Sequence, residues 1–153
     1  MRKMVLFLAG LLLFVSCGGG TQPTPSDDDG MQRVYWANGR LKSESRYVDG
    51  RLDGPFKTWY ENGQLFQDGQ YAAGMMDGSW LIFYPNGQLA AKAQYEKGTG
   101  KQTCYNEDGC IIMEVNYADN QKDGREIHYA FDGSVLQVVE YKQGKKVAEI
   151  NNP

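Results

Sequence analysis

Apolar and polar residues alternate along much of this chain, and glycines interrupt the alternation at regular intervals. Five glycines preceded by Asn or Asp lie 24, 24, 22 and 24 residues apart, each with an aliphatic residue two positions later and a tyrosine eight positions later. A fixed period of this length indicates a tandem array in which each unit packs on its neighbours. The glycines are Gly39, Gly63, Gly87, Gly109 and Gly133, and the tyrosines are Tyr47, Tyr71, Tyr95, Tyr117 and Tyr141.

Each unit contains two turn signals, one for each end of a β-hairpin. The first is the Asn-Gly or Asp-Gly pair, and the second is a pair such as Ala73-Gly74 between two tyrosine-bearing segments. Asn-Gly and Asp-Gly supply the positive φ angles of two-residue hairpin turns. We therefore expect an all-β fold: an elongated, twisted antiparallel β-meander of five tandem β-hairpin repeats of about 24 residues. The expected repeats are residues 30–53, 54–77, 78–99, 100–123 and 124–147.

A two-residue turn also determines which side chains face each other across a hairpin. With Asn-Gly as the turn, every repeat tyrosine lies opposite a glycine, as Tyr95 lies opposite Gly78, and bulky Phe56 lies opposite Gly69. The 22-residue repeat lacks two residues, which is one full pleat, so no side chain changes face. The tyrosine face is the expected core, and the sheet must bury it by curling or under another layer.

The opposite face is mostly charged but carries one aromatic residue per repeat. One interpretation is cross-strand stabilisation of a thin sheet, worth roughly 0.2 to 1 kcal/mol per pair. The other is a contact surface, since aromatic residues are enriched at protein interfaces. Across the turn these residues are expected to face a second column that includes Phe66 and Ile112. The residues predicted to bind a partner are Trp59, Phe66, Phe83, Tyr105, Ile112 and Tyr129.

The first residues have the pattern of a secretory signal: two basic residues precede an apolar run that ends at Ser16-Cys17. The run is too short to span a bilayer. Its end resembles the lipobox of bacterial lipoproteins, in which cleavage exposes an acylated cysteine. We therefore expect anchoring to the outer membrane in the cell envelope, on its periplasmic or surface side. The predicted segments are a lipoprotein signal peptide (residues 1–16), a flexible tether (17–28) that starts at the lipidated Cys17, and a repeat domain (29–153).

The composition excludes some classes of partner and offers little catalytic chemistry. A net charge of −3 disfavours nucleic acid or anionic lipid as the main partner. The single histidine, His128, falls in a core-face column, so packing explains it better than catalysis. The sequence shows no nucleophile with a base at recognisable spacing, no phosphate loop and no metal-ligand cluster. We predict a protein that is not an enzyme and has no catalytic residues, no metal and no cofactor.

Two cysteines flank the fourth turn of a chain that is expected to be exported, where disulfides form. The expected register places Cys104 on the inward face and Cys110 on the outward face. A bridge between them requires the turn to open into a five-residue loop. Both the bridged and the free state stay open from the sequence.

Residues 53–65 and 77–89 resemble the bacterial variant of the MORN repeat. Both run Asp-Gly-x-aromatic, then an aromatic pair, then Asn-Gly-Gln-Leu. The resemblance covers about residues 29–147, and the outer repeats depart from it at the Phe or Trp position, which is Gln32, Gln102 or Glu126. Proteins with this repeat include YwqK-type antitoxins and modules that contact proteins or lipids.

The resemblance and the expected anchor together imply a class of function. We expect a non-enzymatic, lipid-anchored binding or scaffold module of the cell envelope that binds an unidentified protein, with an antitoxin or immunity role as a special case. The alternative is a structural or glycan-contacting accessory lipoprotein of the envelope.

Overall fold

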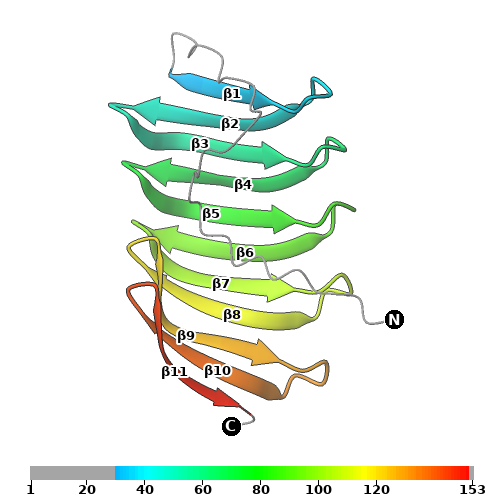
Figure 1. Ribbon diagram of the computed structural model, residues 1–153, viewed down its shortest axis with the longest axis vertical. Helices are drawn as coiled ribbons and strands as arrows, with labels where there is room; N and C mark the ends of the chain where they lie inside the picture. Colours follow the sequence, from blue (N-terminus) through cyan, green and yellow to red (C-terminus); the bar gives the residue numbers. More distant parts are fainter. Residues whose placement is uncertain (1–29, 152–153) are drawn as a thin grey trace.

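The computed structural model describes residues 30–151, which form eleven β-strands and no helix. The strands lie in one open sheet in chain order, and every neighbouring pair is antiparallel (Figure 1). This confirms the predicted all-β meander of hairpin repeats. The strands are Met31–Tyr35 (β1), Leu41–Val48 (β2), Arg51–Trp59 (β3), Leu65–Ala72 (β4), Met75–Phe83 (β5), Leu89–Glu96 (β6), Thr99–Tyr105 (β7), Ile111–Ala118 (β8), Gln121–Tyr129 (β9), Val135–Lys142 (β10) and Lys145–Asn151 (β11).

The Asn-Gly and Asp-Gly loops differ from the predicted two-residue turns. In the first loop, Gly39 N donates to Trp36 O and Trp36 N donates to Arg40 O, which closes a three-residue loop. Gly39 has the left-handed φ of 82° that ends such a loop. The Asn38 side chain accepts a hydrogen bond from Arg40 N at 3.0 Å and so stabilises the wider form. The other four loops repeat the backbone pattern, so the predicted turn type is wrong at all five sites.

The predicted register nevertheless holds in the body of each hairpin. In the first one Val34 pairs with Ser43 but Tyr35 pairs with Leu41, so Lys42 is an extra residue in β2. The loop is one residue longer than predicted, and the bulge inserts one extra residue into β2. Together they produce the same pairing in the body of the hairpin as a two-residue turn would. The predicted pairs Tyr71–Gly54, Tyr95–Gly78, Tyr117–Gly100 and Tyr141–Gly124 are all present.

The two-residue turns lie at the other end of the hairpins. There both central residues have positive φ, for example Ala73 at 49° and Gly74 at 88°, as type I′ turns require. In three of the strand pairs joined by these turns, the second strand contains two extra residues a few positions after the turn. A glycine at positive φ, such as Gly78, lies at each of these irregularities. The pairing of β6 with β7 has no such irregularity. The 22-residue repeat therefore lacks only this irregularity, and its side chains stay on the predicted faces.

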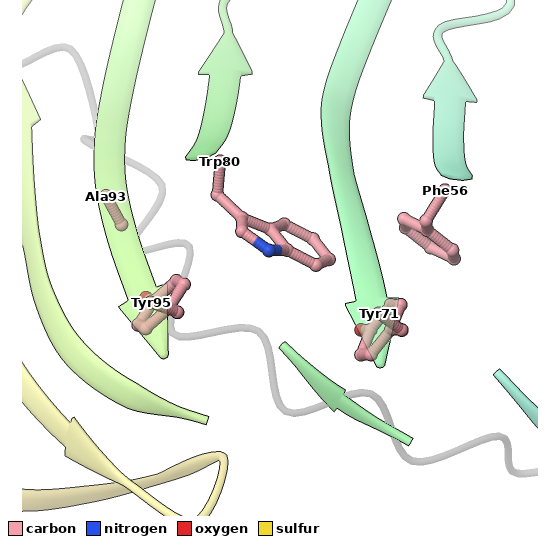
Figure 2. Packing of buried hydrophobic residues seen from close by; sticks show 5 residues of the cluster. All are labelled: Phe56, Tyr71, Trp80, Ala93 and Tyr95. Carbon is pink, nitrogen blue, oxygen red and sulfur yellow. The ribbon is translucent and has the colours of Figure 1, made fainter. Parts of the chain in front are cut away.

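One face of the sheet carries the core, a cluster of buried residues on β3 to β6. The indole of Trp80 lies edge-to-face against two rings, Tyr71 at a centroid distance of 5.0 Å and Tyr95 at 6.4 Å (Figure 2). Phe56 and Ala93 complete the cluster. Burial raises the pKa of Tyr71 to about 12, so its hydroxyl stays neutral. The rings bury one another and supply the core that a single sheet otherwise lacks.

Side-chain volume is balanced along the middle of this face. In the two repeats closest to the MORN pattern a large aromatic residue pairs with Gly or Ala. In the last two repeats a polar residue replaces the aromatic one, and its partner is valine. The smaller side chain is thus matched by a larger neighbour, which keeps the row filled. The pairs are Phe56–Gly69, Trp80–Ala93, Gln102–Val115 and Glu126–Val139.

At two glycines near this row, an added side chain would first meet a residue other than the one paired with the glycine. A Cβ atom on Gly69 would lie 2.3 Å from the indole of Trp80, and the three atoms nearest to it all belong to this indole and not to the paired Phe56. A Cβ atom on Gly78 would meet the Gln70 side chain at 2.7 Å instead of a tyrosine ring. Gly78 also has a φ of 69°, which favours glycine.

Candidate binding surface

The face opposite the core carries a row of mainly charged side chains that crosses the sheet, here called the outward row. Arg33 Nε lies 2.9 Å from Glu44 Oε2, and Lys57 Nζ lies 3.3 Å from Asp68 Oδ2. All four side chains are partly exposed, so each pair contributes at most about 1 kcal/mol. In register, the outward row is Arg33, Glu44, Lys57, Asp68, Leu81, Lys92, Thr103, Glu114, Ile127, Val138 and Ile150.

Four aromatic residues predicted to contact a partner end strands β3, β5, β7 and β9, beside the outward row. Trp59, Phe83, Tyr105 and Tyr129, here called the aromatic column, are all half-buried. Each pairs across the loop with the aliphatic residue two positions after the glycine, one position earlier than predicted. The difference arises because these pairs lie between the three-residue loop and the bulge. The bulge restores the predicted register only for the residues further along the strand. The pairs are Trp59–Leu65, Phe83–Leu89, Tyr105–Ile111 and Tyr129–Val135.

Phe66 and Ile112, the other two predicted contact residues, are the extra residues of these bulges. The ring of Phe66 packs against Tyr60 at a centroid distance of 4.9 Å. In the first repeat the equivalent Lys42 places its Nζ atom 4.5 Å from the centroid of the Trp36 ring. The expected pairing across the turn is therefore wrong: neither residue is paired with the aromatic column, and Phe66 packs on Tyr60.

A ladder of hydrogen bonds holds the backbone of the aromatic column, and sequence reasoning did not identify it. The second residue of each aromatic pair donates to a backbone carbonyl in the next repeat. The ladder ends where Asn106 and Ala130 replace this second aromatic residue. The aromatic pair that recurs in the sequence is the feature from which these bonds could have been predicted. The bonds run from Trp36 Nε1 to Trp59 O (3.1 Å), from Tyr60 Oη to Phe83 O (2.8 Å) and from Tyr84 Oη to Tyr105 O (2.6 Å).

Charged neighbours surround the last two members of the aromatic column. Lys92 Nζ lies 5.7 Å from the centroid of the Tyr105 ring, within range of a cation–π interaction. Tyr129 Oη donates to Glu114 Oε2 at 2.9 Å, and Lys101 Nζ lies 2.6 Å from Glu114 Oε1. The bond from Lys101 lowers the pKa of Glu114 despite partial burial. The charged carboxylate thereby keeps the Tyr129 hydroxyl in position.

The sequence analysis also did not predict a polar cluster on the core face, although Glu126 in this cluster departs from the repeat pattern. Glu126 is 5% exposed, contacts Lys122 Nζ and lies with Oε1 2.8 Å from His128 Nε2. Burial raises the pKa of Glu126, but the bonds from Lys122 and His128 outweigh this effect, so the pKa is lowered. The cluster is a buried ion pair in the place of an aromatic ring.

The geometry does not make this cluster a nucleophilic site. Cys104 and His128 flank Met113 in register, so they are two strand spacings apart, roughly 10 Å. Burial raises the pKa of the Cys104 thiol and favours its unreactive protonated form. Among residues 30–151, no group of three or more His, Cys, Asp or Glu side chains could hold a metal ion.

The two cysteines of the fourth repeat are free thiols. Cys104 is buried on the core face, as predicted. Cys110 N donates to Asn106 Oδ1 at 2.9 Å, within a three-residue loop. The loop therefore does not take the open form that a bridge requires.

The predicted signal peptide (residues 1–16), the predicted lipidation of Cys17 and the predicted tether (17–28) all fall outside the described residues. Over residues 30–151, no helix of the length and hydropathy needed to cross a membrane is present.

The fold and its surfaces define an open array of β-hairpin repeats. Three consecutive segments, residues 28–49, 52–73 and 76–97, match the family model described as the MORN repeat variant. In the structure they correspond to the hairpins β1–β2, β3–β4 and β5–β6, each centred on an Asn-Gly loop. This match indicates a non-enzymatic repeat module of a kind that often binds proteins or membranes.

Comparison with whole proteins adds little to this. None of the curated proteins matches the chain. Among solved structures, the crystal structure of a GtfA/B complex bound to UDP and GlcNAc matches at 16% identity and a TM-score of 0.28. The match covers 96% of this chain but 29% of that chain, and the TM-score is too low to show a shared fold.

Proposed function

We propose that this protein is a non-enzymatic binding module of the cell envelope, anchored by a lipid on Cys17, and that its aromatic column contacts another protein. The observation that carries the proposal is the column, in which four strands each end in a half-buried aromatic ring on the charged face. A solvent-facing sheet surface ordinarily alternates without such rings. Successive rings are two strand spacings apart, roughly 10 Å, so the column offers repeated contact points.

The hydrogen-bond ladder supports this proposal. It holds the backbone at Trp59, Phe83 and Tyr105 through bonds from the preceding repeat. A surface that is ordered before binding loses less conformational entropy on association. An antitoxin or immunity role is the special case in which the bound protein is a toxin.

The aromatic column is tested by purifying the protein with its partner from its own membrane. Trp59→Ala and Phe83→Ala should each weaken capture of the partner by roughly thirtyfold, because buried aromatic anchors dominate many interfaces. Val48→Ala, which removes an exposed aliphatic side chain at the far end of β2, is the control and should leave capture unchanged.

The competing role, stabilisation of each hairpin, makes a different prediction. If Trp59→Ala and Phe83→Ala lower the melting temperature but still capture the partner, the column is structural. Binding to purified cell-wall glycan that both variants lose would instead favour the glycan-contacting alternative.

The anchor is tested separately. Cys17→Ala should move the protein from the membrane fraction to the soluble fraction, and mass spectrometry should find acyl mass on the wild type only. A variant that stays in the membrane pellet, beside a wild type without lipid, would rule the anchor out.

A further inference from the structure

Large apolar side chains are exposed mainly at the C-terminal end of the sheet. Phe131, in the loop between β9 and β10, is 82% exposed, Ile150 is 53% exposed and Leu136 is 46% exposed. Phe131 lies in this loop, and Leu136 is the extra residue of the bulge directly behind it, so we call these two residues the C-terminal patch.

Changes in the fifth repeat account for the exposure of Phe131 and Leu136. In the second repeat Phe66, the counterpart of Leu136, packs on the ring of Tyr60. The fifth repeat has Ala130 in the place of Tyr60, so Leu136 has no ring to pack against. Phe131 stands at the loop position that is Glu61 in the second repeat. Apolar side chains that gain no burial within the fold, gathered in one region, indicate contact with another molecule.

The loops beside the patch are acidic. The loop between β7 and β8 carries Glu107 and Asp108, and the loop between β9 and β10 carries Asp132. All three side chains are exposed, and none forms an ion pair with another described residue. Residues 106–112 and 130–136 contain no Lys or Arg, whereas the first loop is basic. An apolar patch beside carboxylates has the charge that complements a cationic ligand.

The open edge of β11 is a weaker docking candidate. All of its residues are exposed, and it is the last strand of the sheet. However, Lys145 and Lys146 lie on this strand, and its pairing with β10 is irregular beside Val147. Edge lysines and bulges oppose the addition of another strand.

We infer that the C-terminal patch is a docking surface for a basic segment of a partner protein. Apolar side chains of that segment contact Phe131 and Leu136, and its cations face the three loop carboxylates. Charge complementarity selects this occupant, because the acidic loops attract a cationic segment and repel an anionic lipid surface. The inference rests on the proposed function only in taking the partner to be a protein, since the patch and the aromatic column share no residue.

Calorimetric titration of the full chain with designed peptides tests the inference. The probes are a short synthetic peptide of alternating leucine and lysine and the same peptide with glutamate in place of lysine. The lysine peptide should bind, more weakly as salt is added, and the glutamate peptide should not. Phe131→Ser and Leu136→Ser should each weaken binding of the lysine peptide by about tenfold, and Asp108→Asn by about threefold.

Matched controls lie at the other end of the array. Val48→Ser removes an exposed aliphatic side chain and Asp49→Asn removes an exposed charge, and both should leave peptide affinity unchanged. Phe131 and Leu136 are exposed, so their variants should keep the far-UV circular dichroism and the urea midpoint of the wild type.

Several outcomes would overturn the inference. Equal affinity for the two peptides, or equal weakening by Val48→Ser and Phe131→Ser, would show that the patch does not select a basic segment. A wild-type dimer in sedimentation that Phe131→Ser dissociates would give the patch to a second copy of the chain. Binding to phosphatidylcholine vesicles that Phe131→Ser abolishes would give it to a membrane. None of these results bears on capture through Trp59 and Phe83, so the two proposals fail separately.

Discussion

At the scale of single residues, the core depends on a small residue beside a large one. Gly69 leaves the space that the indole of Trp80 fills. We predict that Gly69→Ala lowers the free energy of unfolding by about 1 to 3 kcal/mol, because the new methyl group overpacks the site. In urea denaturation, Gly69→Ala combined with Trp80→Leu should cost less than the sum of the two single changes.

Phe56 provides the control for this cycle. It pairs with Gly69 in register, but the atoms nearest to a Cβ on this glycine belong to Trp80. The coupling between Gly69→Ala and Phe56→Leu should therefore be smaller. An equal or larger coupling would show that the cross-strand pairing with Phe56, and not the contact with Trp80, explains why this position is glycine.

Glu126 gives the core an acid-sensitive group. Its pKa in the folded state is lowered from the ordinary value of a glutamate, because the bonds from Lys122 and His128 outweigh burial. A carboxyl group with a lowered folded pKa contributes stability that is present above its unfolded pKa and lost as pH falls through the folded pKa. We predict that the stability difference between wild type and Glu126→Gln narrows as pH falls below about 5.

Urea denaturation at a series of pH values measures this difference. Glu149→Gln is the comparison, because Glu149 is exposed on β11 and its loss should cost little. A Glu126→Gln difference that widens in acid would contradict the sign of the pKa shift.

At the scale of elements, bonds between successive repeats hold the two-residue turns in place. Gly98 N donates to Met76 O, and Asn120 N donates to Gly98 O. The Asn120 side chain reaches one repeat further, with Oδ1 2.9 Å from Met76 N and Nδ2 2.9 Å from Gly74 O. It links three turns across the shortened repeat, where the two-residue irregularity is missing.

We predict that Asn120→Gly lowers the free energy of unfolding by about 1 to 3 kcal/mol. Glycine retains the positive φ of 62° at this position, so the change removes the side-chain bonds to Met76 N, Gly74 O and Met75 Sδ without straining the turn. Asp119→Gly, in the same turn at φ 51° and exposed, should change stability by less than about 0.5 kcal/mol. Thermal melts of both variants decide the matter, and equal losses would mean that the turn backbone matters more than the bridge.

At the scale of the whole molecule, stability is unevenly distributed along the array. The buried cluster lies on β3 to β6, the hydrogen-bond ladder ends at Tyr105, and β11 is wholly exposed. In a repeat array each unit is stabilised mainly by its neighbours, so opening starts at the weaker end. We predict that amide hydrogen exchange is slowest in β4 and β5 and becomes faster toward β11. Uniform protection over all hairpins would contradict this gradient.

Tyr84→Phe tests whether the ladder couples neighbouring hairpins. The change removes the bond to Tyr105 O and should cost about 0.5 to 1.5 kcal/mol. Exchange should rise in β7 and β8 more than in β3 and β4. Tyr129→Phe, which removes a bond within the charged face, should leave exchange in β3 to β6 unchanged.

The sequence by itself determined the number and order of the hairpins, the core face and the register in the body of each hairpin. These properties are periodic, and alternation with period two specifies which side of the sheet a residue faces. The face of Trp59 and Phe83 followed from this alternation, and so did the core positions of His128 and Cys104.

Only the tertiary structure decided the local geometry at each end of a hairpin and the contacts between repeats. The Asn38 side chain stabilises a three-residue loop, and the bulge behind the loop compensates for its extra length. The predicted register therefore holds although both the loop and the bulge were unforeseen. The reach of Trp80 over Gly69 and the packing of Phe66 depend on residues of neighbouring strands. Likewise, Glu126 is charged and buried only because Lys122 and His128 meet it there. A periodic pattern specifies faces and spacing, but it does not specify which neighbour a side chain meets, because bulges and side-chain conformations settle that in three dimensions.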